Sequence, residues 1–226
     1  MKPWIELARE SAPDGEELVL RRRGHEYLIV AGGRDLMSSE DESSSRALAD
    51  LGCAHSASGQ KARVLVGGLG MGYTLRAALD ATSPAACIEV AEFVPAVAAW
   101  NEEFLGELAG QPLKDPRCEL HIGDVRRRIV TESATWDAIL RDVDNGPSAH
   151  AHAANSALYS ERGIDHAWQA LKPGGVLGVW SFSDDARFTK RLEKRGFAVE
   201  MNPVPGSRKG RGKHHVIWTA RRRKGS

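Results

Sequence analysis

The fold is decided by the stretch Val64-Leu65-Val66-Gly67-Gly68-Leu69-Gly70-Met71-Gly72-Tyr73-Thr74, an apolar run that stops in a cluster of glycines. Residues 75–79 then continue with the apolar pattern of a helix, so the order is strand, tight loop and helix start. Glycines have no Cβ, so the loop can turn sharply, admit a ligand and leave the amides at the helix N-terminus free to point at it. We interpret Gly67, Gly68, Gly70 and Gly72 as a cradle for a nucleoside-type cofactor, although a G-x-G-x-G pattern also occurs in ordinary turns.

A partner for this loop follows about 20 residues after it. Residues 85–89 read Ala85-Ala86-Cys87-Ile88-Glu89, a second short buried strand that ends in an acid. This is the spacing at which a carboxylate meets the ribose hydroxyls in a βαβ nucleotide site. We predict that Glu89 binds ribose; the alternative is a solvated acid at the end of a strand.

The composition is that of a globular protein. The chain has 226 residues, of which 42% are hydrophobic and 27% charged, and this length is enough for one medium domain with a buried core. No apolar run approaches the roughly 18 residues of a membrane span, and residues 1–13 lack the hydrophobic core of a signal peptide. We therefore expect a cytoplasmic protein with no membrane partner. The three cysteines are widely spaced and lack zinc-site spacing, which predicts no bound metal.

Basic residues concentrate in residues 207–224, although the formal net charge of the chain is only +1. Trp218 belongs to a strand pattern there, and no aromatic side chains interleave with the basic ones for base stacking. We interpret the region as a solvated loop and tail. The alternative is a patch that binds phosphate or nucleic acid.

Residues 1–60 differ in character from the rest of the chain. Two apolar runs, 18–20 and 27–30, flank a basic turn and predict a small antiparallel hairpin. Ser39 and Glu42 form a capping box for a helix that ends near Gly52. We interpret residues 1–60 as a small cap and residues 61–226 as the main domain.

From Lys61 onward, strands alternate with helices, which predicts an α/β fold. We expect a Rossmann-like, mostly parallel twisted sheet with helices on both faces. The predicted strands are residues 62–67, 85–90, 117–122, 136–141 and 175–181. The predicted helices are residues 72–81, 93–105, 125–132, 158–171 and 186–195. Two last runs, 197–201 and 215–219, predict an antiparallel hairpin at one edge of the sheet.

Acids stand where the predicted parallel strands end, and this is the edge at which open parallel sheets bind ligands. Asp124 follows the third strand and precedes Val125, the first residue of the next helix. Its carboxylate can accept a hydrogen bond from the exocyclic amine of a purine, and it can also cap the helix. Both roles are compatible, and we count Asp124 and Val125 as candidate cofactor-binding residues.

The loop after the fourth strand is the predicted reaction centre. Asp142 and Asp144 follow a buried strand, close to where the reactive end of the cofactor should project. A carboxylate there can orient a substrate amine, take its proton and stabilise positive charge. The alternative is a turn whose side chains cap their own backbone. Tyr159, near the start of the next helix, is a candidate wall of the substrate site or a core residue.

Together these motifs resemble the spermidine-synthase-like branch of the class I S-adenosylmethionine-dependent transferases, over about residues 17–220. The resemblance rests on the glycine loop, on Ile88-Glu89, and on the segments 115–124 and 136–142. It implies a small N-terminal β-region, an adenosyl-sulfonium cofactor and a homodimer. It also implies that Asp142 deprotonates an acceptor amine, and that Asn145 stands beside the substrate.

The chain departs from the aminopropyltransferases of this branch at three places. Those enzymes carry an acid inside the glycine loop, where this chain has Gly70, and a second aspartate where it has Asn145. The tyrosine–histidine pair of their polyamine channel is replaced by residues 42–46, which include Arg46. These changes remove negative charge where a polycation would bind.

We therefore expect intact S-adenosylmethionine as the cofactor and methyl transfer to a small-molecule nucleophile, an amine oriented by Asp142. The Asp-Pro-Pro-Tyr-like signature of amino-methylating enzymes is absent, which leaves the acceptor atom open. Aminopropyl transfer of the spermidine synthase type, from decarboxylated S-adenosylmethionine, is one alternative. A non-catalytic protein that binds an adenosyl cofactor or RNA is the other.

Overall fold

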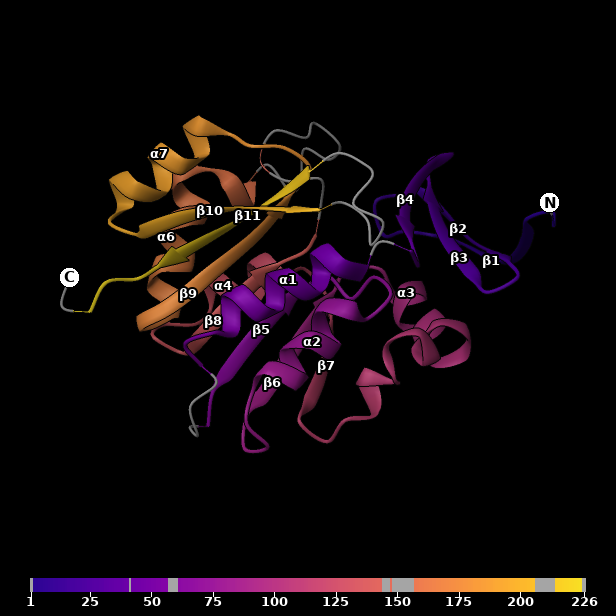
Figure 1. Cartoon of the computed structure of the whole chain (residues 1–226), viewed down its shortest axis with the longest axis horizontal. Helices are drawn as coiled ribbons and strands as arrows, with labels where there is room; N and C mark the ends of the chain where they lie inside the picture. The colour runs from indigo at the N-terminus through magenta and orange to yellow at the C-terminus, as the bar shows by residue number, and fades with distance from the viewer. Residues whose placement is uncertain are drawn as a thin grey trace.

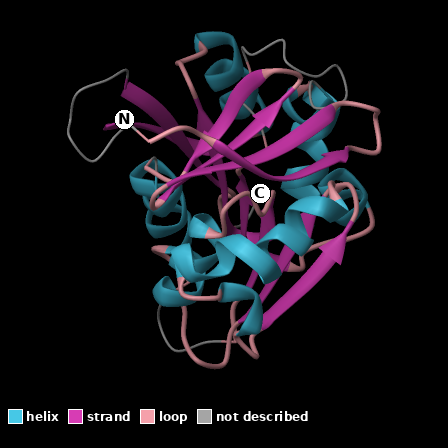
Figure 2. Ribbon diagram, turned by 90° about the vertical axis from the view of Figure 1, so that its right-hand side faces the viewer, coloured by secondary structure: helices cyan, strands magenta, loops and turns pink. Residues whose placement is uncertain are grey.

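The computed structural model describes residues 2–40, 42–56, 61–143, 147, 157–205 and 214–224. Two sheets organise this part of the chain (Figure 1). One is a small antiparallel sheet near the N-terminus. The other is a larger, mostly parallel sheet whose twist and covering helices are seen in Figure 2.

The small sheet pairs its four strands in the order β1-β2-β3-β4. Their bounds are β1 (Ile5–Ser11), β2 (Glu17–Arg23), β3 (Glu26–Ala31) and β4 (Arg34–Ser38). The sequence predicts only the central hairpin, β2 and β3. Strands β1 and β4 lie at the edges with mostly exposed side chains, so they lack the apolar alternation that indicates a strand.

The large sheet pairs its seven strands in the order β10-β11-β9-β8-β5-β6-β7. The parallel strands are β5 (Arg63–Gly67), β6 (Cys87–Glu92), β7 (Cys118–Ile122), β8 (Trp136–Arg141) and β9 (Leu171–Ser181). β11 (His214–Arg221) runs antiparallel to β9, and β10 (Ala198–Pro205) antiparallel to β11. The predicted Rossmann-like sheet with an antiparallel edge hairpin is confirmed. Strand order reverses at β5, so a ligand is expected beyond its carboxyl end.

Helices cover both faces of this sheet. On one face lie α1 (Glu42–Cys53), α2 (Tyr73–Ala81) and α3 (Pro95–Trp100), which continues into the short helical turns η1 (Asn101–Leu105), η2 (Gly106–Ala109) and η3 (Pro112–Lys114). On the other lie α4 (Val125–Val130), α6 (Glu161–Ala170) and α7 (Ala186–Arg195). Val64 and Val66 of β5 pack with the first group and Leu65 with the second. The continuous apolar run of β5 is therefore that of a strand buried on both faces.

Helix α1 packs against β8, β9 and α2, although the sequence places it in the N-terminal cap. Gly52 permits the close approach, because a Cβ at this position would collide with Leu140 of β8. Leu18, Leu20 and Ile29 of the small sheet belong to the same apolar core as α1 and α2. The domain boundary near residue 60 stays a prediction. In the described ranges, no helix has both the length and the apolar character needed to cross a membrane.

Candidate active site

The glycine loop connects β5 to α2 at the carboxyl end of the sheet. Gly68, Gly70 and Gly72 have φ angles of 88°, 52° and 83°, in the left-handed region that glycine adopts without strain. A Cβ on Gly68 would collide with the backbone carbonyl of Asp142. No described side chain caps α2, so amides of its first turn point out of the helix toward the loop. The left-handed glycines therefore turn the chain sharply between β5 and α2, as a backbone cradle for a ligand requires.

Glu92, the last residue of β6, holds the start of this loop. Its carboxylate accepts hydrogen bonds from the backbone amides of Leu69 and Val94, each at 2.8 Å. Burial raises the pKa of Glu92, and the hydrogen bonds from backbone amides offset part of the rise. An acid therefore stands beside the glycine loop at the end of the second parallel strand.

Glu89 does not occupy that position. Strand β6 runs from Cys87 to Glu92 rather than ending at residue 90, so Glu89 lies within it. Its carboxylate pairs with the guanidinium of Arg128 from α4, with 2.8 Å between Nη2 and Oε2. The predicted strand-end placement of Glu89 is wrong because two acids, Glu89 and Glu92, interrupt the same apolar run. The pattern does not reveal which of them ends the strand.

Asp124 caps α4, which is one of its two predicted roles. Its side chain accepts a hydrogen bond from the backbone amide of Arg126 at 2.8 Å and pairs with the guanidinium of the same residue. Burial raises the pKa of Asp124, but the bonds to Arg126 outweigh it and hold the pKa below its usual value. Val125 borders the glycine loop, since a Cβ on Gly67 would lie 3.0 Å from its Cγ2. Contact of either residue with a cofactor stays a prediction.

Asp142 follows β8 directly and faces the glycine loop and two helices. Its backbone amide donates to the carbonyl of Gly67 at 2.9 Å. Its carboxylate accepts a hydrogen bond from the Thr74 hydroxyl of α2 at 2.5 Å and another from the Ser45 hydroxyl of α1. Burial raises the pKa of Asp142, and these two hydrogen bonds counter part of that rise. The sequence pattern does not single out Ser45 and Thr74 as site residues. The signal that could have marked them is a small polar residue on a buried helix face.

The structure does not bring Tyr159 to the carboxylate of Asp142. The Tyr159 ring is buried on the α6 and α7 face and meets Phe188 edge to face, with centroids 5.7 Å apart. The Asp142 carboxylate instead contacts α1 and α2, on the other face. This placement favours the core alternative for Tyr159.

Arg141, the last residue of β8, is a buried cation that sequence analysis does not single out. Its guanidinium donates to the carbonyl oxygens of Leu158 at 2.6 Å and Gly163 at 3.2 Å. Burial lowers the pKa of Arg141 to about 10. Arg141 thus ties the strand that carries Asp142 to the start of α6. The sequence signal that marks it is a basic residue directly after the apolar run Ala138-Ile139-Leu140.

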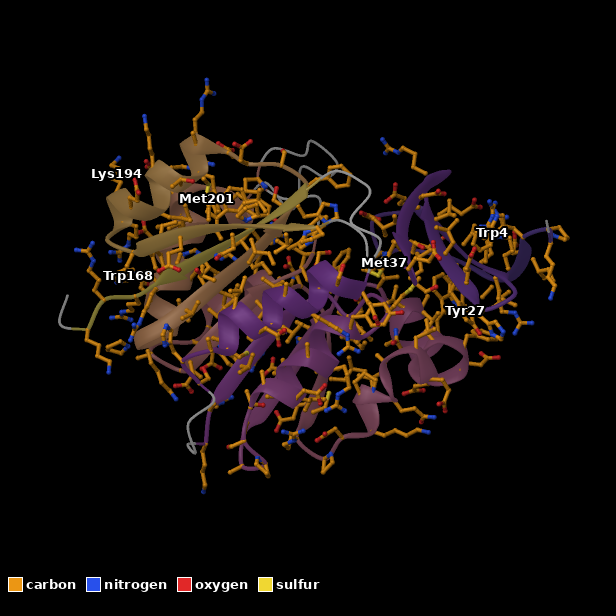
Figure 3. The ribbon with its side chains drawn as sticks, in the orientation of Figure 1. Trp4, Tyr27, Met37, Trp168, Lys194 and Met201 are labelled. Carbon is orange, nitrogen blue, oxygen red and sulfur yellow. The ribbon has the colours of Figure 1, made fainter. Side chains whose placement is uncertain are left out.

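The small sheet contacts the glycine loop through Met37 of β4, which Figure 3 shows at the junction with the main domain. A Cβ on Gly70 would lie 2.7 Å from Cε and 2.8 Å from Sδ of Met37. The Tyr73 hydroxyl donates to the Ser39 carbonyl at 3.1 Å. Asn101 Nδ2 donates to the Gly70 carbonyl at 2.7 Å. The loop is therefore held from both the N-terminal sheet and η1.

Several predicted features lie outside the described residues: Asp144, Asn145, and residues 206–213 of the basic region. Within the described ranges, no three His, Cys, Asp or Glu side chains gather in a way that would hold a metal ion. The roles of Asp144 and Asn145, the homodimer, the cytoplasmic location and nucleic-acid binding stay predictions.

Residues 43–188 match the family model of the spermine/spermidine synthase domain. The chain belongs to this family. The predicted resemblance is confirmed, and the protein is a transferase of the spermidine synthase family.

Solved structures that resemble this family member share its fold. The spermidine synthase from Thermotoga maritima has a TM-score of 0.75 at 16% identity, over 96% of this chain and 72% of that one. A spermidine synthase in complex with the transition-state analogue AdoDATO has a TM-score of 0.74, with 16% identity and the same coverage, 96% and 72%. A probable spermidine synthase from Corynebacterium glutamicum ATCC 13032 has a TM-score of 0.67 at 18% identity, over 95% and 79%. No curated protein matches the sequence.

In this spermidine synthase family member, the carboxyl ends of β5, β6 and β8 bring together the glycine loop, Glu92 and Asp142. Asp124 stands at the end of the neighbouring strand β7. Glu89 and Tyr159 lie within the packed interior instead. The candidate site is therefore a row of three acids, Asp142, Glu92 and Asp124, along the carboxyl edge of the sheet. The glycine loop lies between Asp142 and Glu92.

Proposed function

We propose that this family member transfers an alkyl group from an adenosyl-sulfonium donor to an amine, with Asp142 as the proton acceptor. The observation that carries the proposal is the position of the Asp142 carboxylate. It is fixed by Thr74 and Ser45 beside a loop of left-handed glycines, the kind of loop that binds a ligand through its backbone. A carboxylate so placed can orient an incoming amine and remove its proton.

The residues around the loop fit the nucleoside part of such a donor. Glu92 takes the ribose role that the sequence assigns to Glu89, because its carboxylate is the one beside the loop. Asp124 and Val125 border the adenine side, and the exposed ring of Phe93, directly after Glu92, can stack on a purine. In this proposal these residues bind and orient the donor, and none of them takes part in breaking its carbon–sulfur bond.

The chemistry requires little of the protein beyond alignment and one proton transfer. When bound, the donor supplies a carbon on a positively charged sulfur, which leaves as a neutral thioether. The amine nitrogen forms the new bond to that carbon, and its proton passes to Asp142. Burial raises the pKa of Asp142, which makes it a stronger base than an exposed aspartate.

Aminopropyl transfer is the first candidate for the transferred group. It is supported by the spermine/spermidine synthase domain and by the fold shared with spermidine synthases. The donor is then decarboxylated S-adenosylmethionine and the acceptor a polyamine precursor with a primary amine.

Methyl transfer from intact S-adenosylmethionine is the second candidate, and Gly70 favours it. At the position where the aminopropyltransferases of this branch carry an acid, the chain has no side chain. An ammonium at the end of the donor would therefore meet no carboxylate from residue 70 itself.

A product assay with both donors tests the proposal. Purified protein is incubated with either donor and a panel of aliphatic mono- and diamines, and products are identified by mass spectrometry. We expect an alkylated amine with one donor, formation of which is lost in Asp142→Asn and kept in Asp184→Asn, an exposed aspartate used as the control. Absence of product with both donors, together with no binding of methylthioadenosine, would overturn the proposal.

A further inference from the structure

Three aromatic side chains gather at the carboxyl end of β9, where β9 pairs with β11. The ring centroid of Trp180 lies 4.7 Å from that of His215 and 6.3 Å from that of Phe182, and Phe182 lies 5.1 Å from His215. His215 is buried, whereas Phe182 is 44% exposed. These three residues, here named the aromatic cluster, stand at the edge where open parallel sheets bind ligands, and the chemistry described so far uses none of them.

Trp180 stands beside Asp142 on the same face of the sheet. Arg141 of β8 pairs with Val179 of β9, so Asp142 and Trp180 are the next residues along two neighbouring parallel strands. Such strands lie about 4.8 Å apart. The Asp142 carboxylate contacts α1 and α2, and Trp180 packs against the apolar core to which these helices belong. The aromatic cluster therefore begins next to the proposed proton acceptor.

The glycine loop and the aromatic cluster lie on opposite sides of Asp142. The strand order β11-β9-β8-β5 places the loop that follows β5 on one side of β8, and Trp180 of β9 on the other (Figure 1). In a displacement at carbon, the nucleophile approaches in line, from the side opposite the leaving sulfur. An amine whose nitrogen meets Asp142 therefore has its body over β9 and β11. This step rests on the proposed function.

The acids of the segments that adjoin the aromatic cluster are engaged or exposed. Asp185 accepts hydrogen bonds from two backbone amides as the cap of α7. Glu42 of α1 pairs with Arg46 of the same helix at 3.7 Å, and Asp184 is exposed to solvent. The imidazole of His215 supplies no negative charge in either protonation state near neutral pH. What the aromatic cluster offers to an acceptor is therefore an apolar surface.

We propose that the aromatic cluster binds the body of the acceptor and selects a monoamine with an apolar or aromatic body over a diamine. The rings remove apolar surface of the acceptor from water, and the gain grows with the area covered. A second ammonium would lose part of its hydration there and gain only a cation–π contact. Either donor can alkylate such a monoamine, so the selection does not depend on which group is transferred. It does set aside the diamine that polyamine synthesis uses.

Three amines test this selection by binding alone, without turnover. Pentylamine and 1,4-diaminobutane have the same length and differ in one end, which is a methyl group or a second ammonium. The third amine, 2-phenylethylamine, carries an aromatic ring. Their affinities are measured by titration calorimetry in the presence of methylthioadenosine, which occupies the donor side without reacting.

Four variants assign the selection to the aromatic cluster. Phe182→Ala removes the exposed ring, Trp180→Gln removes the ring beside Asp142, and Trp180→Phe keeps a ring there. The distant control is Met201→Ala, an exposed methionine of β10 whose sulfur contacts Thr189 of α7 on the other face of the sheet (Figure 3). Circular dichroism establishes that each variant is folded.

We expect the wild type to bind pentylamine and 2-phenylethylamine more tightly than 1,4-diaminobutane, by about tenfold or more. Phe182→Ala and Trp180→Gln should each weaken binding of 2-phenylethylamine by about 5- to 10-fold, because they remove apolar contact area. They should change the affinity for 1,4-diaminobutane by less than about threefold, and Trp180→Phe and Met201→Ala should leave all three affinities within about threefold.

The inference is overturned if 1,4-diaminobutane binds as tightly as pentylamine, or if Phe182→Ala binds 2-phenylethylamine as tightly as the wild type does. Phe182 is exposed, so its truncation is expected to fold, and its result decides the matter if Trp180→Gln does not fold. The expected binding preference without product from either donor would support the inference and count against the proposed function. Product from 1,4-diaminobutane alone would support the proposed function and overturn the inference.

Discussion

At the scale of single residues, the acids of the site differ in what they contact, and this separates their roles. Glu89 is neutralised by Arg128 inside the sheet, whereas Glu92 meets backbone amides at its edge. The sequence predicts correctly that an acid follows the glycine loop on the next strand. It cannot choose between Glu89 and Glu92, because the choice depends on where β6 stops pairing with β5 and β7.

Exchanging each of these acids for its amide should separate binding from stability. Glu92→Gln should weaken binding of methylthioadenosine by about 1–3 kcal/mol, through loss of charge-assisted hydrogen bonds. Glu89→Gln should leave that affinity within about threefold and lower the free energy of unfolding by about 1–2 kcal/mol, because Arg128 loses the closer of its two carboxylate partners and keeps only Glu132. Calorimetry and urea unfolding measure the two effects. The opposite pattern would return the ribose role to Glu89.

Asp142→Asn should slow turnover by on the order of 100-fold or more while leaving donor affinity nearly unchanged. The amide keeps the shape of the side chain but cannot accept a proton from the amine. Single-turnover rates and donor titration measure the two quantities. A rate equal to that of the wild type would reduce Asp142 to a residue that shapes the loop.

The pH profile of turnover should reflect the environment of Asp142. Its pKa is raised, so the carboxylate takes up a proton at a higher pH than an ordinary aspartate, whose pKa is about 3.9. As the pH is lowered, activity should therefore begin to fall at a pH above about 3.9. Thr74→Val removes a hydrogen bond that lowers the pKa, so it should move the acidic limb to still higher pH. A limb that Thr74→Val leaves in place would argue against Asp142 as the titrating group.

At the scale of elements, the sequence predicts best where the pattern is local. Strand β5, the glycine loop and α2 follow one another within the stretch that opens the main domain, and all were predictable from glycine spacing and apolar runs. Met37 was not predictable as part of the site, because it comes from β4, an edge strand that sequence analysis misses. The contacts of Asp142 with Ser45 and Thr74 also join elements that are distant in the chain.

Gly68 of the glycine loop and Gly15, in the turn between β1 and β2, form a matched pair of substitution sites. Comparing them isolates the effect of steric crowding at Gly68. Gly68 and Gly15 have φ angles of 88° and 89°, but only Gly68 has a backbone carbonyl where a Cβ would stand. Gly15→Ala should destabilise the protein by about 1–2 kcal/mol, from backbone strain alone. Gly68→Ala should cost clearly more, because Asp142 must move, and it should also weaken donor binding. Equal decreases in the free energy of unfolding, measured with urea, would show that the loop accommodates the added methyl group without a steric cost.

At the scale of the whole molecule, the small N-terminal sheet and the main domain share one core. Leu18, Leu20 and Ile29 pack in the same cluster as residues of α1, α2 and β5. The sequence treats residues 1–60 as a separate cap because their composition differs, and composition does not reveal which side chains pack across the junction. The shared core implies that the two parts unfold together.

Leu20→Ala tests this cooperativity. Leu20 is fully buried, so its truncation should lower the free energy of unfolding by about 2–5 kcal/mol. The whole chain should still unfold in one transition, at a lower temperature, by circular dichroism and by tryptophan fluorescence. Leu36→Ala on β4, where the side chain is exposed, should change stability by less than about 0.5 kcal/mol. Two separate transitions in Leu20→Ala would show that the small sheet is an independent unit.

The Asp142 carboxylate accepts hydrogen bonds from α1 and α2, and the Asp142 amide donates one to β5, so the contacts lie on both sides of the glycine loop. Under the proposed function, the orientation of the proton acceptor is thus set during folding and does not have to be supplied by the binding of substrate. Such preorganisation removes from the reaction barrier the entropy of fixing a flexible side chain. Ser45 and Thr74 are then subject to selection for catalytic rate, although neither has to touch the amine that reacts.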